Sequence, residues 1–287
     1  MFTAKQQMST SRRSLSERCR ILPISLVVVL IAVSFTASVT PSHAVVTPFG
    51  QRVNEAINRG LDWLRANQEN NGGWGRPTGL ALLCFLEQRA GADWNAPALG
   101  YVGMDPADQD RVERGVRYCI NDINSFSPGG QAQSYDAGAC MMAMSLYLTS
   151  GGPPNVGAEQ SVDQAINNGI DNLNRNQGGN GGFSYGNSNS IDMSTHQFAM
   201  MGLFAASRLN PAALNRLGQA ANYSRETQNN DGGHGYQPGR SSTSPMTASG
   251  VWTYKLSGRE TEDGGLQQSL QWLQNNYRYQ DHINSKQ

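Results

Sequence analysis

The sequence has no excess of charge of either sign and few charged residues altogether. Lys and Arg number 22 and Asp and Glu also number 22, so the formal net charge is zero and only 15% of the residues are charged. Proteins that grip nucleic acid usually carry a basic face, so this balance argues against that function class. The 32 glycines follow no Gly-x-y repeat, which excludes a collagen-like triple helix.

Beyond residue 45 the chain has no apolar run long enough to cross a membrane. The one long apolar run covers residues 21–39 and follows a segment with five basic residues and one acidic residue. Ser42-His43-Ala44 then supplies the small residues of a signal-peptidase site. We therefore expect residues 1–44 to be a cleaved signal peptide. The protein is then exported to the periplasm, the cell envelope or the outside.

An uncleaved signal anchor is the alternative, because the apolar run approaches the ~20 residues that span a bilayer. The pair Arg12-Arg13, followed by Leu15, resembles a twin-arginine export signal, so the export route stays open. Cleavage leaves a domain of residues 45–287 with 17 basic and 21 acidic side chains. Such a domain has no charge that would steer it to nucleic acid or to an anionic membrane.

Cysteine is scarce as well. Beyond residue 44 only Cys84, Cys119 and Cys140 remain, with no Cys-x-x-Cys spacing. An odd number in an exported chain allows at most one disulfide and leaves at least one free thiol. Each of the three lies in an apolar helical stretch, which predicts small buried hydrophobic side chains. A disulfide between two of them is the alternative.

What the sequence does contain is an internal repeat, the feature to seek first in a glycine-rich chain. Three segments superpose on Gln68, Gln177 and Gln228, each with a glycine five positions later and a ring directly after that glycine. The glycines are Gly73, Gly182 and Gly233, and the rings are Trp74, Phe183 and His234. Weaker copies around positions 123 and 277 give successive steps of 55, 54, 51 and 49 residues. The predicted repeat period is therefore about 50 residues.

The residues within each repeat predict two helices. Before the glutamine, apolar residues recur with the spacing of one helical face, as in Ile57-Leu61-Leu64. We expect the glycine pair to end this outer helix. A second stretch is apolar around most of its circumference, as expected for a buried inner helix; these stretches cover residues 78–88, 136–148, 192–207 and 246–256. With no period-two strand, the prediction is an all-α domain of four complete helical hairpins and a fifth outer helix.

The residues Gly-x-x-Trp-Leu-x-x-x-Gln-x-x-x-x-Gly-Trp-Gly around Gln68 resemble the QW motif of squalene and terpene cyclases. The same helix-pair repeat occurs in protein prenyltransferase β subunits. The resemblance covers roughly residues 51–277, and the stretch from Gly235 to Trp252 resembles secreted bacterial members of this family that mostly lack an assigned activity. It implies an α/α toroid, in which inner helices ring a central cavity. Family toroids have five to six hairpins, so an open ring and an edge covered by a second subunit both remain possible here.

The catalytic residues of the family do not carry over directly. Cyclases of this family protonate an alkene with an Asp-x-Asp-Asp motif, and this chain has no adjacent aspartates. Its nearest approach is Asp105, Asp108 and Asp110, which we expect to cap a helix N-terminus. A divergent cyclase-type enzyme would need another acid, and Asp136 and Asp192 on the inner helices are the candidates.

Zinc and uronate chemistry are also poorly matched. The prenyltransferase zinc pattern is Asp-x-Cys plus a His, whereas Asp136 and Cys140 stand four apart and Thr195 replaces the His, with His196 one residue off. One residue on a helix is a rotation of ~100°, so we expect no metal and no cofactor. A polysaccharide lyase would need a base and cations, and Arg240, His234 and Tyr236 are its scattered candidates.

Asp136, Asp192 and His196 remain the candidate site residues. They could gather at one mouth of the barrel, because the inner helices should begin at the same end. Alternatively the two aspartates cap their own helices and His196 bonds a neighbouring helix end. We expect a non-catalytic binding or scaffold module for a hydrophobic small molecule, a glycan or a protein. The alternative is a divergent cyclase acting on an isoprenoid, and the surroundings of the two aspartates discriminate between them.

Overall fold

The computed structural model describes residues 47–89, 96–125, 133–186 and 190–278. The expected signal peptide, residues 1–44, lies outside the described residues. The described part is all-helical, without a β-strand, which confirms the predicted all-α class. Its helices are α2 (Pro48–Ala66), α3 (Thr78–Leu86), α4 (Pro106–Ser125), α5 (Gln133–Thr149), α6 (Val162–Asn176), α7 (Met193–Ala206), the 3₁₀ turn η1 (Pro211–Arg216), α8 (Leu217–Thr227), α9 (Ser244–Leu256) and α10 (Gly264–Asn276).

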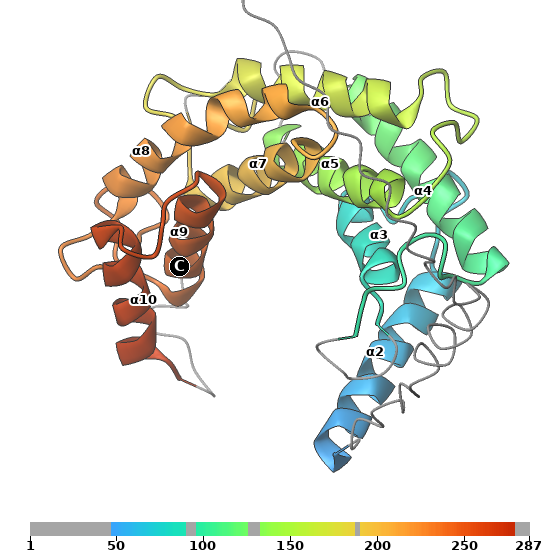
Figure 1. Cartoon of the computed structure of the whole chain (residues 1–287), viewed down its shortest axis with the longest axis horizontal. Coiled ribbons are helices and arrows are strands. Elements are labelled where there is room, and N and C mark those ends of the chain that lie inside the picture. Colours follow the sequence, from blue (N-terminus) through green and yellow to red (C-terminus); the bar gives the residue numbers. More distant parts are fainter. Residues whose placement is uncertain (1–46, 90–95, 126–132, 187–189, 279–287) are drawn as a thin grey trace, which may run out of the picture. The chain divides into compact units, whose positions relative to one another are not determined.

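The α-helices alternate between two layers along the chain (Figure 1). The inner helices α3, α5, α7 and α9 contact one another in that order. The outer helices α2, α4, α6, α8 and α10 pack against them, and each consecutive pair of helices is in contact. None of the described helices combines the length and apolar character needed to span a bilayer.

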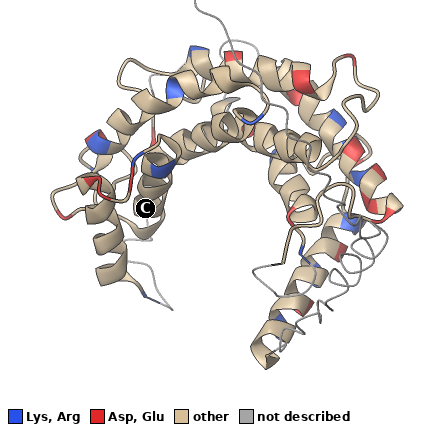
Figure 2. Ribbon diagram, viewed as in Figure 1, with Lys and Arg blue, Asp and Glu red and all other residues tan. Residues whose placement is uncertain are grey.

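The two layers differ sharply in charge. Figure 2 shows most of the charged residues on the outer helices and the loops. Across the four inner helices the only charged residues are Asp136 on α5 and Lys255 on α9. Low charge is expected for helices with neighbours on several sides, because an unpaired buried charge is costly. Asp136 therefore stands out as the one acid on the inner layer.

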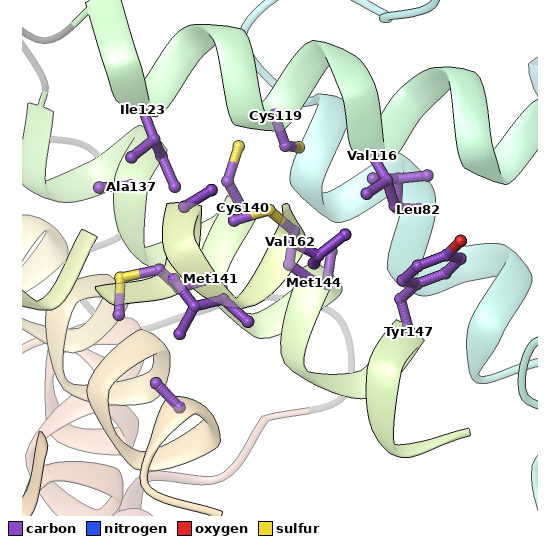
Figure 3. Close-up of a cluster of buried hydrophobic side chains, with 14 of the residues drawn as sticks. Leu82, Val116, Cys119, Ile123, Ala137, Cys140, Met141, Met144, Tyr147 and Val162 are labelled. Atoms are coloured by element: carbon purple, nitrogen blue, oxygen red, sulfur yellow. The ribbon is translucent and has the colours of Figure 1, made fainter. Parts of the chain in front are cut away.

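Two of the cysteines belong to the main core. Figure 3 shows Cys119 of α4 and Cys140 of α5 in a buried cluster with Val116 and Met144. All three cysteines beyond residue 44 are free thiols, so the alternative of a disulfide is not realised. The prediction that all three are buried is wrong for Cys84, which is exposed.

The glycine pair does not end the outer helices. Helices α6 and α8 end at Asn176 and Thr227, directly before the repeated glutamine. Helix α2 ends at Ala66, two residues before Gln68. The first glycine of each pair instead lies in the turn that follows, with φ of 90°, 86° and 87° at Gly72, Gly181 and Gly232. Only glycine adopts this backbone without strain. The backbone of Gln177 and Gln228 is extended, so α6 and α8 end at the residue before each of them.

The repeated glutamine fastens each turn to the next outer helix. The Gln68 side-chain amide donates to the Gly72 carbonyl in its own turn and to the Arg111 carbonyl in α4, both at 2.8 Å. The other two glutamines repeat this pair of bonds, from Gln177 to Gly181 and Arg216, and from Gln228 to Gly232 and Gly265. The repeated residues are therefore structural, and they fix the spacing of the hairpins that carry the inner helices.

Candidate ligand-binding site

The inner helices share an apolar pocket of about 310 Å³. All four contribute to it, and its lining includes Leu83, Met142, Met201, Phe204, Trp252 and Leu256. Phe204 and Trp252 line the same pocket and are 39% and 51% exposed, so together they form part of an apolar surface open to solvent. The volume lies at the small end of the range for ligand pockets, about 300–1,000 Å³.

A second pocket, of about 380 Å³, lies beside the beginning of α5 and is more polar at one wall. Arg76, Tyr135, Asp136 and Tyr185 supply polar groups, and Leu80 supplies an apolar wall. Leu80 stands three residues before Leu83 on α3, and residues three apart share a helix face. The two pockets therefore lie along one continuous face of the inner layer.

Asp136 faces the second pocket and does not cap its helix. Because α5 begins at Gln133, Asp136 lies within its first turn, and its Oδ2 is 3.3 Å from the Nε of Arg76. Burial raises the pKa of Asp136, and the Arg76 guanidinium partly offsets this. Burial also raises the pKa of Asp122 to about 6, with repulsion from Asp136 adding to the shift and Arg76 opposing it. Two carboxyl groups with raised pKa values thus share one arginine.

Asp192 is the N-cap of α7. Its Oδ1 accepts hydrogen bonds from the Thr195 backbone N–H at 2.9 Å and from the Ser194 hydroxyl at 2.7 Å. The Ser194, Tyr185 and Tyr236 hydroxyls lie 3.3 Å from one another, so the cap continues into a hydroxyl cluster at the pocket edge. This arrangement is the capping alternative for Asp192, because an aspartate at an N-cap satisfies the free N–H groups of its own helix.

His196 lies away from both pockets, in the interior. It is fully buried between the rings of Phe183 and Tyr223, with centroid distances of 5.7 and 5.0 Å. Burial lowers the pKa of His196 to about 3, and the Ala220 backbone offsets this only slightly. Among the described residues, neither ring nitrogen has a hydrogen bond of ordinary geometry. His196 therefore behaves as a neutral core ring, and the structure does not bring it together with Asp136.

We expect His196 to make the protein sensitive to acid. Its pKa is about 3 in the folded state against 6.5 ordinarily, so below pH 6.5 the unfolded chain binds the proton more readily. Stability then falls as the pH drops from 6.5 toward 3, by at most ~1.4 kcal/mol per pH unit. The variant His196→Phe should show a shallower fall in urea unfolding free energy between pH 6.5 and 4.5. His234, whose pKa burial lowers to about 4, is retained in the variant and leaves a residual slope.

At pH 7.5 the same variant should lose at most ~1.5 kcal/mol, because it replaces one buried ring with another of similar size. Parallel pH profiles for the two proteins would show that His196 is protonated in the folded state or reaches solvent.

The described residues that were candidates for zinc or uronate chemistry do not lie together. Among the residues that the structure describes, no three His, Cys, Asp or Glu side chains lie close enough to hold a metal ion. His234 is buried in its turn, where Thr227 and Ser269 bond its two ring nitrogens at 3.2 and 2.9 Å. A base held in this way is not open to a substrate. Tyr236 belongs to the hydroxyl cluster instead, and Arg240 lies on the surface.

Comparison with known proteins adds no assignment. No protein-family model matches the chain, and no curated protein matches it. The site must therefore be interpreted from its own residues. Sequence analysis does not identify Leu80, Leu83 and Trp252 as pocket residues. The inner helices are apolar on all sides, so periodicity cannot select the face that bounds the pockets.

Proposed function

We propose that the chain is an exported α/α-toroid repeat module that binds a hydrophobic small molecule along the inner helices. The observation that carries the proposal is the apolar pocket to which α3, α5, α7 and α9 all contribute, with Phe204 and Trp252 partly exposed in it. Exposed aromatic and aliphatic side chains in a concave site favour an apolar ligand. The polar wall at Arg76 and Asp136 would then receive the polar end of that ligand.

Binding without catalysis is favoured by the state of the two aspartates. Asp192 is committed to capping α7, and Asp136 is paired with Arg76. A proton donor for an alkene must be a pre-positioned neutral acid, and the Arg76 partner opposes that state of Asp136, although burial raises the pKa of Asp136 overall. The Asp-x-Asp-Asp sequence of the resembling cyclases is also absent.

One observation favours a divergent cyclase-type enzyme as the second candidate. Asp122, whose pKa is raised to about 6, lies close enough to Asp136 for the two carboxyl groups to repel each other. Raised carboxyl pKa values are common where an acid donates a proton. This candidate requires conversion of an acyclic isoprenoid such as squalene into a cyclic product, and loss of that product in Asp136→Asn.

The binding proposal is tested with farnesol as the probe. Exposed Cys84 stands four residues after Leu80 and one after Leu83 on α3, and these two leucines line the pockets. Bound farnesol should therefore slow labelling of Cys84 by a thiol reagent, while Cys119 and Cys140 stay unlabelled in the folded protein. Truncation of a large apolar contact costs ~1.5–3 kcal/mol, so Trp252→Ala should raise the farnesol Kd about 10-fold or more.

The matched control is Trp63→Ala on α2, which removes a tryptophan of similar exposure, 61%, that lines neither pocket. Its Kd for farnesol should stay within a factor of two or so of the parent value. Equal losses in the two variants, or no protection of Cys84 at saturating farnesol, would overturn the proposed site.

A further inference from the structure

The first outer helix, α2, leaves most of its apolar side uncovered. Only Leu61 is buried, whereas Phe49, Ile57 and Trp63 are 65%, 47% and 61% exposed. The outer helices α4, α6 and α8 in the middle of the chain have no large apolar side chain that is exposed in this way. Singly exposed apolar residues need no explanation, but several on one helix mark an interaction surface.

The position of these residues in the repeat shows which surface this is. Trp63 lies five residues before Gln68, as Tyr223 lies five residues before Gln228. Tyr223 packs on Gly182, in the turn of the preceding hairpin, so that a Cβ there would lie 2.9 Å from its ring. Tyr118 and Trp272 cover Gly73 and Gly233 in the same manner. In the later outer helices, the residue equivalent to Trp63 packs on the preceding hairpin. The Trp63 side of α2 therefore corresponds to the face with which those helices contact that hairpin.

Gly60 supports the same conclusion. Its counterpart in α4 is Gly115, where a Cβ would lie 2.7 Å from Leu82 and 3.2 Å from Trp74, both in the preceding hairpin. A Cβ on Gly60 meets nothing within 4 Å. Helix α2 thus has the face that packs on a preceding hairpin in the later repeats, but no hairpin lies against that face within the described residues.

The exposed side carries the spacing of a helix-to-helix seam. Phe49, Val53, Ala56, Gly60 and Trp63 follow one another at intervals of four, three, four and three residues. This is the a/d spacing of two packed helices, in which large side chains insert between residues of the partner helix. In an antiparallel pair of α2 helices, Phe49 of one copy lies opposite Gly60 of the other, and Val53 lies opposite Ala56. Large residues thereby meet small ones.

We propose that two copies of the chain associate through this seam of α2. Signal cleavage after Ala44, expected from the sequence, leaves only Val45 and Val46 ahead of Thr47, which is too short to cover the helix. A two-fold contact between identical faces is self-limiting and is the commonest symmetry of soluble oligomers.

Sedimentation equilibrium of the mature chain, residues 45–287, tests the proposal between 1 and 100 µM or so. The parent protein should be a dimer, and Phe49→Lys should be monomeric with unchanged helical circular dichroism. Trp252→Lys, which places the same charge at an exposed tryptophan outside α2, should remain dimeric. A monomeric parent at the highest concentration, or dimers in all variants, would overturn the proposal.

Cross-linking gives a second measurement that does not depend on loss of association. In a Cys84→Ala background, Ala56→Cys should form an intermolecular disulfide on mild oxidation by oxidised glutathione, because residue 56 lies close to the two-fold axis. Asn58→Cys, on the polar side of α2, should not. Equal cross-linking of both variants, or a dimer that Leu270→Lys on α10 abolishes and Phe49→Lys does not, would place the contact elsewhere.

Discussion

Replacing Gly138 by alanine should destabilise the protein by about 3 kcal/mol or more, because overpacking a close helix contact costs ~1–3 kcal/mol and a backbone clash adds to it. A Cβ at Gly138 on α5 would collide with the Phe198 carbonyl of α7. A Cβ at Gly202 on α7 would in turn lie 2.7 Å from the Gly138 Cα. The two inner helices therefore meet backbone to backbone, and neither can retreat without opening the pockets that both of them line.

Urea unfolding followed by circular dichroism measures this effect, and Gly218→Ala is the matched control. Gly218 lies in α8, where an added Cβ meets nothing within 4 Å. Alanine is the better helix former by up to ~1 kcal/mol, so the control should be unchanged or slightly more stable. If Gly138→Ala were as stable as its parent, the close crossing of α5 and α7 would be wrong. The farnesol proposal also predicts weaker binding in this variant, through movement of Met142 relative to Met201.

The sequence predicted the helices better than the turns between them and the long-range contacts of those turns. Apolar spacing placed the outer helices, and buried apolar stretches placed the inner ones within a few residues of their observed ends. The glycine pair was assigned to a helix C-terminus because glycine is common there. In the structure the glutamine ahead of it leaves the helix first, since its amide bonds both its own turn and the next outer helix. That long-range bond has no local signal in the sequence.

The candidate site shows the same limit. The sequence names both Asp136 and Asp192 as candidates, and only the observed helix bounds leave Asp136 as the one acid within the inner helices. Its partner Arg76 lies 60 residues earlier in the chain, before α3, and no motif connects the two. His196 was proposed beside the aspartates from helix order alone. A shift of one residue turns a helical side chain by ~100°, and the His196 ring lies among Phe183 and Tyr223 instead.

Truncating Asp108 to alanine should cost about 3 kcal/mol, the lower end of what breaking a buried ion pair costs. Asp108 is only 3% exposed, at the start of α4. Its carboxylate accepts from both Nε and Nη2 of Arg65 on α2, the latter at 2.7 Å, and from Arg111 at 2.6 Å. The hydrogen bond to Asp108 is the main cause of the raised pKa of Arg65, although burial opposes it. Removing the carboxylate takes away the acceptor that Arg65 and Arg111 share, and Arg65 keeps its partner Asp62, at 2.8 Å on the exposed side of α2.

The control is Asp110→Ala, two residues along the same helix. It measures what the loss of an exposed ion pair costs in stability, for comparison with the buried Arg65–Asp108 pair. Asp110 is bonded to Arg114 at 3.1 Å, but its side chain is 71% exposed, so its loss should cost at most ~0.5 kcal/mol. Because the Arg65–Asp108 pair joins α2 to α4, Asp108→Ala should also free α2 from the rest of the domain before global unfolding. Hydrogen exchange of α2 amides should then accelerate more than that of α5 amides. Uniform acceleration in both helices would mean that α2 is held by its apolar contacts to α3 and not by this ion pair.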